Sequence, residues 1–316
     1  MTTGFLFSHK APNWKLIDSP GHRKVHVRAT PRTGGLAMVA AVALAWLVGA
    51  WAGQLHVPGG PWQTWVAGLG FILVGALDDR FSFQPRQKFL VLLLLSALAA
   101  WPWAQKLAAP GFPGIHVGPW TLRPGGFAGG LLLTLWFMAV PNATNIEDAI
   151  NGYMGGFALI LLAAMAWNGV HTYALLGALA GFIVLNWPRA VHFMGDCGSF
   201  GCGFLLAECL LRGGGFERPL YALILTAPVS LDMAMGLVRR LRRRVSPFTP
   251  DQGTLPHHVL GLVKGSTLWA AGLLWVNALV FVLLAPHPWL AGSYGVLFVG
   301  VLVMFNRASL FKLSPP

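Results

Sequence analysis

The sequence predicts an all-α protein that crosses a membrane about ten times. Of its 316 residues, 55% are hydrophobic and only 10% are charged, which is typical of polytopic membrane proteins and unlike a soluble domain. The second observation is the length of the apolar segments, since a helix needs about 20 apolar residues to span a bilayer. The ten candidate spans are residues 35–53, 62–77, 88–104, 127–141, 152–167, 170–187, 198–211, 219–238, 266–285 and 288–305.

The basic residues predict on which side of the membrane each connection lies. Lys and Arg accumulate in the cytoplasmic connections of membrane proteins. If residues 1–34 lie inside and the spans alternate, 18 of the 22 Lys and Arg residues fall on the cytoplasmic side. This bias explains the net charge of +12 without a nucleic-acid partner. We therefore expect one membrane domain, residues 1–316, with a basic cytoplasmic segment at 1–34 and a cytoplasmic functional loop at 239–265.

Two further stretches carry weaker structural signals. Residues 115–122 surround the turn dipeptide Gly118-Pro119 and are equally consistent with a small β-hairpin and with an irregular loop. Cys197, Cys202 and Cys209 lie in or beside one apolar segment, and their spacing fits neither a zinc site nor a disulfide framework. We expect these cysteines to be small packing residues.

The few carboxylates of the chain stand where apolar runs end. Only ten Asp and Glu residues are present, and Asp78, Asp79, Glu147, Asp148 and Asp196 each close or follow an apolar run. Ionised groups at the edge of a bilayer are costly unless they are solvated, paired or bound to a cation. The alternation derived from basic residues places all five on the cytoplasmic side, so we expect them to meet there.

The adjacent pair Asp78-Asp79 is a candidate for binding a divalent cation or for accepting protons. Carboxylate oxygens suit Mg²⁺, which usually binds one or two carboxylates together with substrate phosphates. Arg86 and Lys88 follow the pair and are candidates for binding substrate. The structural alternative is a salt bridge between the pair and Arg80 at the membrane rim.

The segment NATNIEDAING crowds polar side chains into one short connection. It contains Asn142, Asn145, Glu147, Asp148 and Asn151. If the segment is helical, residues three apart share a face, so Asn145 and Asp148 lie together. One face then offers amide and carboxylate oxygens for a metal ion and a phosphate, which favours a functional role over a plain loop.

The segment FMGDCGSFGCGF places Asp196 between two glycines just before a helix. Gly195 and Gly198 permit unusual backbone angles or close approach, and Ser199 could cap the helix. Free N–H groups at a helix N-terminus suit an anion, and Asp196 suits the metal ion of that anion. Close packing of membrane helices is the alternative explanation for the glycines.

The last cytoplasmic connection begins with five arginines and ends with two histidines. The arginines between 239 and 244 are most simply an anchor at an anionic leaflet. In SPFTPDQGTLPHH the three prolines predict an ordered turn rather than a helix. His257 and His258 could donate to a phosphate or act as an acid. Asp232 lies within the preceding span and needs a partner, for which Arg239 or Arg240 is the candidate.

The N-terminal stretch LIDSPGHRKVHVRATPRTGG is basic and rich in turn residues. Its cations could bind phosphates, although the positive-inside rule explains most of them. These residues are His22, Arg23, Lys24, His26, Arg28 and Arg32.

Four of these stretches, in order, resemble the polyprenyl-phosphate N-acetylhexosamine-1-phosphate transferases, of the glycosyltransferase family 4 type. The matching motifs are GALDDRF, NATNIEDAING, FMGDCGS and RRLRRRVSPFTPD followed by HH, and TPRTGG also looks like the N-terminal loop of the family. The likeness is strongest to the branch that transfers N-acetylglucosamine-1-phosphate to undecaprenyl phosphate, and it covers nearly the whole chain.

The resemblance implies an enzyme of the bacterial inner membrane with its active site on the cytoplasmic face. It implies transfer of a sugar-1-phosphate from a UDP-sugar to undecaprenyl phosphate with release of UMP, as the initiating step of a lipid-linked surface glycan such as O-antigen. The cofactor would be Mg²⁺, or Mn²⁺ in its place. The other expected partner is membrane lipid, and a homodimer is left open.

The resemblance also implies a role for each candidate residue. Asp196 and Asp148 would bind the metal ion, and Asp78, Asp79 and Asp148 would be catalytic. Substrate binding would involve Asn142, Asn145, Asn151, His257, His258, Arg86 and Lys88.

Three departures from the family pattern keep alternatives open. Ala149 replaces a usual glycine, Leu255 and Pro256 occupy the place of an earlier histidine, and only about a dozen residues precede the basic loop where relatives carry a membrane helix. A non-catalytic relative is therefore one alternative. The others are the phospho-MurNAc-pentapeptide transferase of peptidoglycan synthesis and a membrane transporter.

Overall fold

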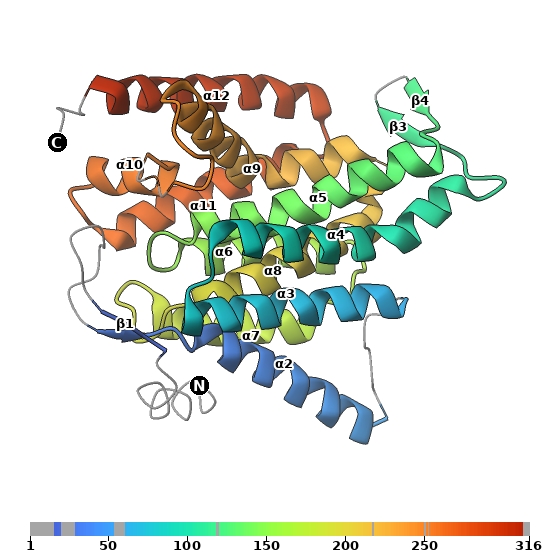
Figure 1. Cartoon of the computed structure of the whole chain (residues 1–316), viewed down its shortest axis with the longest axis horizontal. Helices are drawn as coiled ribbons and strands as arrows, with labels where there is room; N and C mark the ends of the chain where they lie inside the picture. Colours follow the sequence, from blue (N-terminus) through green and yellow to red (C-terminus); the bar gives the residue numbers. More distant parts are fainter. Residues whose placement is uncertain are drawn as a thin grey trace.

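The computed structural model is a bundle of long helices that run roughly along one direction (Figure 1). It describes residues 16–19, 29–53, 61–117, 120–216, 218–249, 251 and 253–311. All ten apolar segments predicted from the sequence are helical. They form α2 (Gly34–Trp51), α3 (Trp62–Phe81), α4 (Pro85–Ala108), α5 (Gly126–Glu147), α6 (Tyr153–Trp167), α7 (Tyr173–Asn186), α8 (Gly195–Leu210), α9 (Pro219–Arg242), α11 (Thr267–Leu284) and α12 (Pro288–Phe311).

Six of the described helices are long and apolar enough to cross a membrane, judged by length and composition: α2, α4, α5, α9, α11 and α12. The chain is therefore a multi-pass membrane protein. At a rise of about 1.5 Å per residue, the 15 residues of α6 span about 22 Å, less than the roughly 30 Å of a bilayer core. The count of ten crossings and the sides of the connections remain predictions.

Helix α8 forms the centre of the bundle. Every residue from Cys197 to Leu210 except Leu205 is buried, and the helix packs against α2, α3, α5 and α6. The three cysteines are free and buried on this helix, as expected of packing residues. A short π-helix, η1 (Leu211–Gly215), continues α8 at its far end.

The close approach of α2 to α8 depends on glycine. A Cβ added to Gly35 would overlap the backbone nitrogen of Gly198, and the N–H of Gly35 donates to the carbonyl of Met194 at 2.9 Å. Backbone-to-backbone contact of this kind is why small residues concentrate where membrane helices meet.

Among the described residues, four short strands form two antiparallel pairs. Strands β3 (Ile115–Val117) and β4 (Trp120–Leu122) form the hairpin that was one of the two possibilities left open by the sequence, although its turn at 118–119 lies outside the described residues. Strands β1 (Ile17–Asp18) and β2 (Thr30–Pro31) form a second pair near the start of α2. Most of segment 1–34, including residues 22–28 with five of the candidate phosphate-binding cations, lies outside the described residues.

The sequence predicted an ordered turn rather than a helix for the segment that ends at His258. This prediction was wrong for the second half of the segment. Residues Leu255–Leu262 form α10, which begins with Pro256 in its first turn. Proline is tolerated there because the first N–H groups of a helix have no intrahelical partner. Pro250 lies outside the described residues.

We expect Gly35→Ala to destabilise the bundle, because the new methyl group overlaps the backbone of α8. Overpacking of this kind typically costs about 1–3 kcal/mol. The measurement is thermal unfolding of the purified protein in detergent. Gly177→Ala is the matched control, since a Cβ at Gly177 of α7 meets open space. Equal stability of the two variants would contradict the close contact.

Candidate functional site

A polar cleft is lined by residues near β1 and α10. Figure 1 shows both elements at the same end of the bundle. The volume of the cleft is about 680 Å³, and its walls come from the connections that the basic residues assigned to one side. The residues of its wall include Asp18, Thr30, Arg32, Asp79, Asn145, Asp148, Asn151, Asn186, Arg189, Asp196, His257 and Thr267. The expectation that the acids of several connections meet in space is thus confirmed for Asp79, Asp148 and Asp196.

Asp79 binds the beginning of the central helix. The backbone N–H groups of Asp196 and Cys197 donate to the two carboxylate oxygens of Asp79, each at 3.0 Å. A carboxylate at this place pairs two N–H groups that would otherwise lack an intrahelical partner, and it opposes the positive end of the helix dipole. The sequence predicted that the N-terminus of α8 suits an anion, and in the structure the Asp79 carboxylate is an anion that accepts from two of its N–H groups.

Gly195 makes this contact sterically possible. Its φ of +68° lies in the left-handed region, and a Cβ there would stand 2.6 Å from an oxygen of Asp79. Glycine adopts such angles without strain and leaves room for the carboxylate. The sequence predicted unusual backbone angles or a close approach at this glycine, and the structure confirms both.

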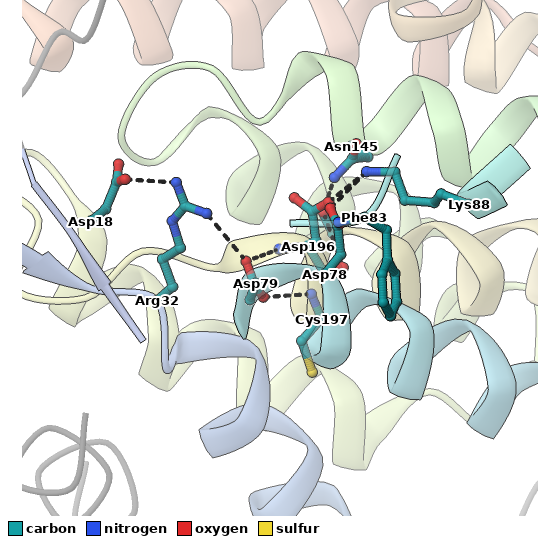
Figure 2. Close-up of polar contacts among 10 residues, drawn as sticks. Asp18, Arg32, Asp78, Asp79, Phe83, Lys88, Asn145, Asp196 and Cys197 are labelled. Atoms are coloured by element: carbon teal, nitrogen blue, oxygen red, sulfur yellow. Dashed lines mark hydrogen bonds and ion pairs between the residues drawn. The ribbon is translucent and has the colours of Figure 1, made fainter. Parts of the chain in front are cut away.

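Asp78 points to a different partner from its neighbour. The Lys88 ammonium lies 2.8 Å from Asp78 and 3.0 Å from Asp196, so it bridges the two carboxylates. The N–H of Phe83 also donates to Asp78 at 2.7 Å. Figure 2 shows Asp78, Lys88, Asn145 and Asp196 converging on one point. The alternative salt bridge to Arg80 does not occur, because that guanidinium lies over the ring of Phe81.

Arg32, the residue after β2, adds a basic side chain to the cleft. Arg32 lies 2.6 Å from Asp18 of β1 and 3.8 Å from Asp79, so it joins the hairpin to the acidic end of the cleft (Figure 2). For six N-terminal cations, among them Arg32, the sequence left two explanations open: phosphate binding and the positive-inside rule. Its place in the cleft wall favours the first.

Asn145 and Asp148 share one face at the end of α5, as the spacing predicted. Asn145 donates to the hydroxyl of Ser199 at 2.9 Å. Asn145 and Asp148 both line the cleft. Burial raises the pKa of the Asp148 carboxyl to about 7, and the negative charges of Asp196 and Asp79 act in the same direction. The acids are therefore close enough to disfavour one another's charge, which is the electrostatic condition that a bound cation relieves.

The two adjacent histidines have different surroundings. His257 lines the cleft, and its Nδ1 lies 2.7 Å from the Thr254 hydroxyl, so Nε2 is the ring nitrogen left for a ligand. Burial and the neighbouring His258 lower its pKa. His258 stacks on Phe305 at 4.9 Å, with its Nδ1 3.0 Å from the carbonyl of Thr254. The structure thus does not bring His258 to the cleft.

Of three other predicted substrate-binding residues, one lines the cleft and two do not. Asn151 lines the cleft and donates to the carbonyl of Pro188. Asn142 instead donates to the carbonyl of Met138 on its own helix at 2.7 Å, and Arg86 is exposed in the first turn of α4. Neither is among the described residues of the cleft wall.

The cleft also contains polar residues that the sequence did not single out. Asn186 accepts from the N–H of Gly152 at 2.6 Å and donates to the carbonyl of His192 at 2.8 Å, which ties the connection after α5 to the one after α7. Arg189 and Asp18 also line the cleft. Their signal in the sequence was weak because each is an isolated polar residue: Asn186 ends α7, Asp18 lies in β1 and Arg189 lies in the bend after α7.

Comparison with known proteins assigns the chain to a family. The model of glycosyl transferase family 4 matches residues 62–214, which include α3 to α8 and three of the chain segments that line the cleft. A protein of Yersinia pestis is 31% identical over 270 residues, which cover 78% of this chain and 69% of that protein. The chain belongs to glycosyl transferase family 4.

The relatives carry closely similar names. The Yersinia pestis protein and one from Salmonella typhi, 30% identical over 82% of this chain and 73% of its own length, are each named undecaprenyl-phosphate alpha-N-acetylglucosaminyl 1-phosphate transferase. A Bacillus subtilis protein named as a probable undecaprenyl-phosphate N-acetylglucosaminyl 1-phosphate transferase is 25% identical over 77% of this chain and 69% of its own.

We expect Asp79→Ala to lower stability more than Asp78→Ala does. The first variant leaves two N–H groups at the buried start of α8 without an acceptor, and an unsatisfied buried donor costs about 1–3 kcal/mol. The second removes a carboxylate whose partners, Lys88 and Phe83, lie closer to solvent. Thermal unfolding in detergent measures both. Equal losses would show that Asp79 does not support α8.

Proposed function

We propose that this protein transfers N-acetylglucosamine-1-phosphate from UDP-N-acetylglucosamine to undecaprenyl phosphate and releases UMP. The observation that carries the proposal is one cleft in which Asp79, Asp148 and Asp196 gather with Arg32 and His257. Acids for a metal ion and cations for phosphates are the side chains that phosphoryl transfer requires. Membership of the family and the names of the relatives support the choice of substrates.

The acidic end of the cleft fits Mg²⁺. Among the described residues, no three His, Cys, Asp or Glu side chains form a complete metal cage. Mg²⁺ does not need one, because it usually binds one or two carboxylates and completes its shell with water and substrate phosphates. Asp148 and Asp196 would supply the carboxylates and Asn145 a neighbouring amide. Bound there, the ion would neutralise negative charge on the transferring phosphate.

The side chains around the acids would position the two substrates. His257 and Arg32 would contact the phosphates of the UDP-sugar, while Asn151, Asn186 and Arg189 line the cleft for the rest of the donor. Lys88, between Asp78 and Asp196, supplies positive charge beside the acids for the acceptor phosphate. The inner-membrane edge on the cytoplasmic side is where a soluble nucleotide sugar and a lipid phosphate can both reach.

The transfer itself needs little proton chemistry. An oxygen of the acceptor phosphate attacks the phosphorus that carries the sugar, and the bond from that phosphorus to UMP breaks. The second pKa of a phosphate monoester is about 6, so the acceptor is largely a dianion at pH 7 and requires no general base. The contacts of Asp79 with α8 and of Asp78 with Lys88 support roles in organising the site over roles as a base.

The rival functions receive less support. A transporter places its charged groups near the middle of the membrane. Here Glu208 pairs with Arg212 within its own helix turn, and Asp232 accepts from the N–H of Leu255, so both intramembrane acids have structural partners. The phospho-MurNAc-pentapeptide alternative lacks support from the relatives described above, which are named for N-acetylglucosamine.

The direct test is release of UMP. Purified protein in detergent, with undecaprenyl phosphate, Mg²⁺ and a panel of UDP-sugars, should release UMP with UDP-N-acetylglucosamine and far less with UDP-MurNAc-pentapeptide. Omission of the lipid phosphate is the control for hydrolysis. Absence of UMP with every sugar would refute the enzymatic proposal.

We expect Asp196→Asn to abolish Mg²⁺-dependent turnover while the protein still folds. The amide retains the shape of the side chain, and the N–H contacts with Asp79 involve only the backbone of residue 196. Removal of one charged group that stabilises the transition state costs about 10²–10³ in rate. Turnover at various Mg²⁺ concentrations, with thermal unfolding as the folding control, measures this. Unchanged turnover would exclude Asp196 as a ligand.

The two histidines provide an internal comparison. We expect His257→Ala to raise the KM for the UDP-sugar about tenfold or more, because a hydrogen bond to a charged group contributes about 1.5–3 kcal/mol. His258→Ala should change the KM little, since its ring packs on Phe305. Initial-rate kinetics at saturating acceptor measure both. The reverse order of effects would contradict the assignment of His257.

A further inference from the structure

A buried polar cluster lies behind the cleft, outside the site described above. We refer to Glu147, Tyr153, Asp232, Arg239 and Asp251 as the α9 cluster, because Asp232 and Arg239 of α9 stand at its centre. Glu147, Tyr153, Asp232 and Arg239 are each at most 2% exposed. Burial of three acids and one arginine in an apolar bundle costs free energy, so we expect the cluster to have a function.

The first arm of the cluster docks α10. The carboxylate of Asp232 accepts from the N–H of Leu255 at 2.5 Å, and Leu255 is the first residue of α10. The predicted partner of Asp232 was Arg239 or Arg240, but this backbone N–H takes that place. His257 lies two residues further along, and its ring is oriented by Thr254. The contact therefore sets where His257 enters the cleft.

The second arm holds the chain that leads into α10. Arg239 donates from Nε to Asp251 at 2.8 Å; the Arg239 side chain is buried and that of Asp251 is 9% exposed. The other oxygen of Asp251 accepts from the N–H of Gly253 at 2.9 Å. Asp251 and Leu255 are thus attached to α9 at two points, Arg239 and Asp232.

The third arm reaches the acidic end of the cleft. Glu147, the residue before Asp148, is fully buried at the end of α5, which packs against α9, and it interacts electrostatically with Asp232 and Arg239. Among the described residues, neither Nη2 of Arg239 nor the hydroxyl of Tyr153 has a hydrogen bond. Unpaired buried groups cost about 1–3 kcal/mol each, and departures of this kind from good packing concentrate at functional sites.

We propose that the α9 cluster is a positioning unit that sets the geometry between Asp148 and His257. Asp148 follows Glu147, which is buried where α5 packs against α9, and His257 is held through the contact of Leu255 with Asp232. Asp148 would bind the metal ion and His257 the donor phosphates. Both residues are thereby positioned relative to the same helix, α9. This inference rests on the proposed function, and it assigns Asp232 and Glu147 a role through other residues rather than contact with substrate.

The decisive comparison is Asp232→Ala with Asp232→Asn. The alanine variant removes the acceptor for Leu255, so the KM for the UDP-sugar should rise about tenfold while kcat falls much less. The asparagine variant keeps an oxygen for that N–H and can donate its amide to Glu147, so it should restore most of the affinity. Glu208→Gln is the control, because Glu208 is a buried acid paired with Arg212 far from the cleft.

A double-mutant cycle separates positioning from general loss of stability. If Asp232 acts through His257, Asp232→Ala should raise the KM little in a His257→Ala background, because the group it positions is already absent. Additive effects of the two substitutions, or no rescue by asparagine, would overturn the proposal.

Hydrogen exchange provides a readout that does not depend on turnover. In Asp232→Ala the amides of residues 253–262 should exchange faster than in the unsubstituted protein, while those of α4 should not change. Unchanged exchange at α10 would overturn the inference even if the enzyme is active. Failure of the unsubstituted protein to release UMP, with faster exchange in the variant, would instead count against the proposed function while supporting the docking of α10.

Discussion

The pairing of Asp79 with two backbone N–H groups at the start of α8 is the contact on which the rest of the site depends. Helix α8 is the most enclosed helix of the bundle, so its first turn cannot rely on water for hydrogen bonds. Asp79 supplies both acceptors from α3, and the orientation of Asp196 follows from them. The left-handed Gly195 is a consequence of the same contact, because no side chain fits beside the carboxylate.

Charge balance is the second constraint on the cleft. Asp78, Asp79, Asp148 and Asp196 bring four acids to one end of the bundle, and the cations that pair with them among the described residues are Lys88 and Arg32. The remaining negative charge suits a divalent ion, whose own charge would be shared with the phosphates of the donor. The two acids of the adjacent pair have different partners. Asp79 accepts from the N–H groups at the start of α8, and Asp78 pairs with the ammonium group of Lys88.

Several elements could be read from the sequence because their signal is local. Apolar runs located ten helices, and Gly118-Pro119 marked a turn at which a hairpin was one of two possibilities. The three-residue spacing of Asn145 and Asp148 put both in the cleft. Helix α10 was missed because proline usually ends helices, although its first turn accepts one. The separation of His257 from His258 could not be foreseen, because it depends on Phe305, far along the chain.

The sequence by itself determined the membrane class, the positions of the helices and the set of acids that could meet, because hydropathy, charge bias and spacing act over short stretches. Only the tertiary structure decided which acid does what. Asp79 and Asp78 are neighbours in sequence, yet one faces α8 and the other faces Lys88 of α4. Side chains one residue apart on a helix point about 100° apart, and the partners they meet are set by packing between distant segments.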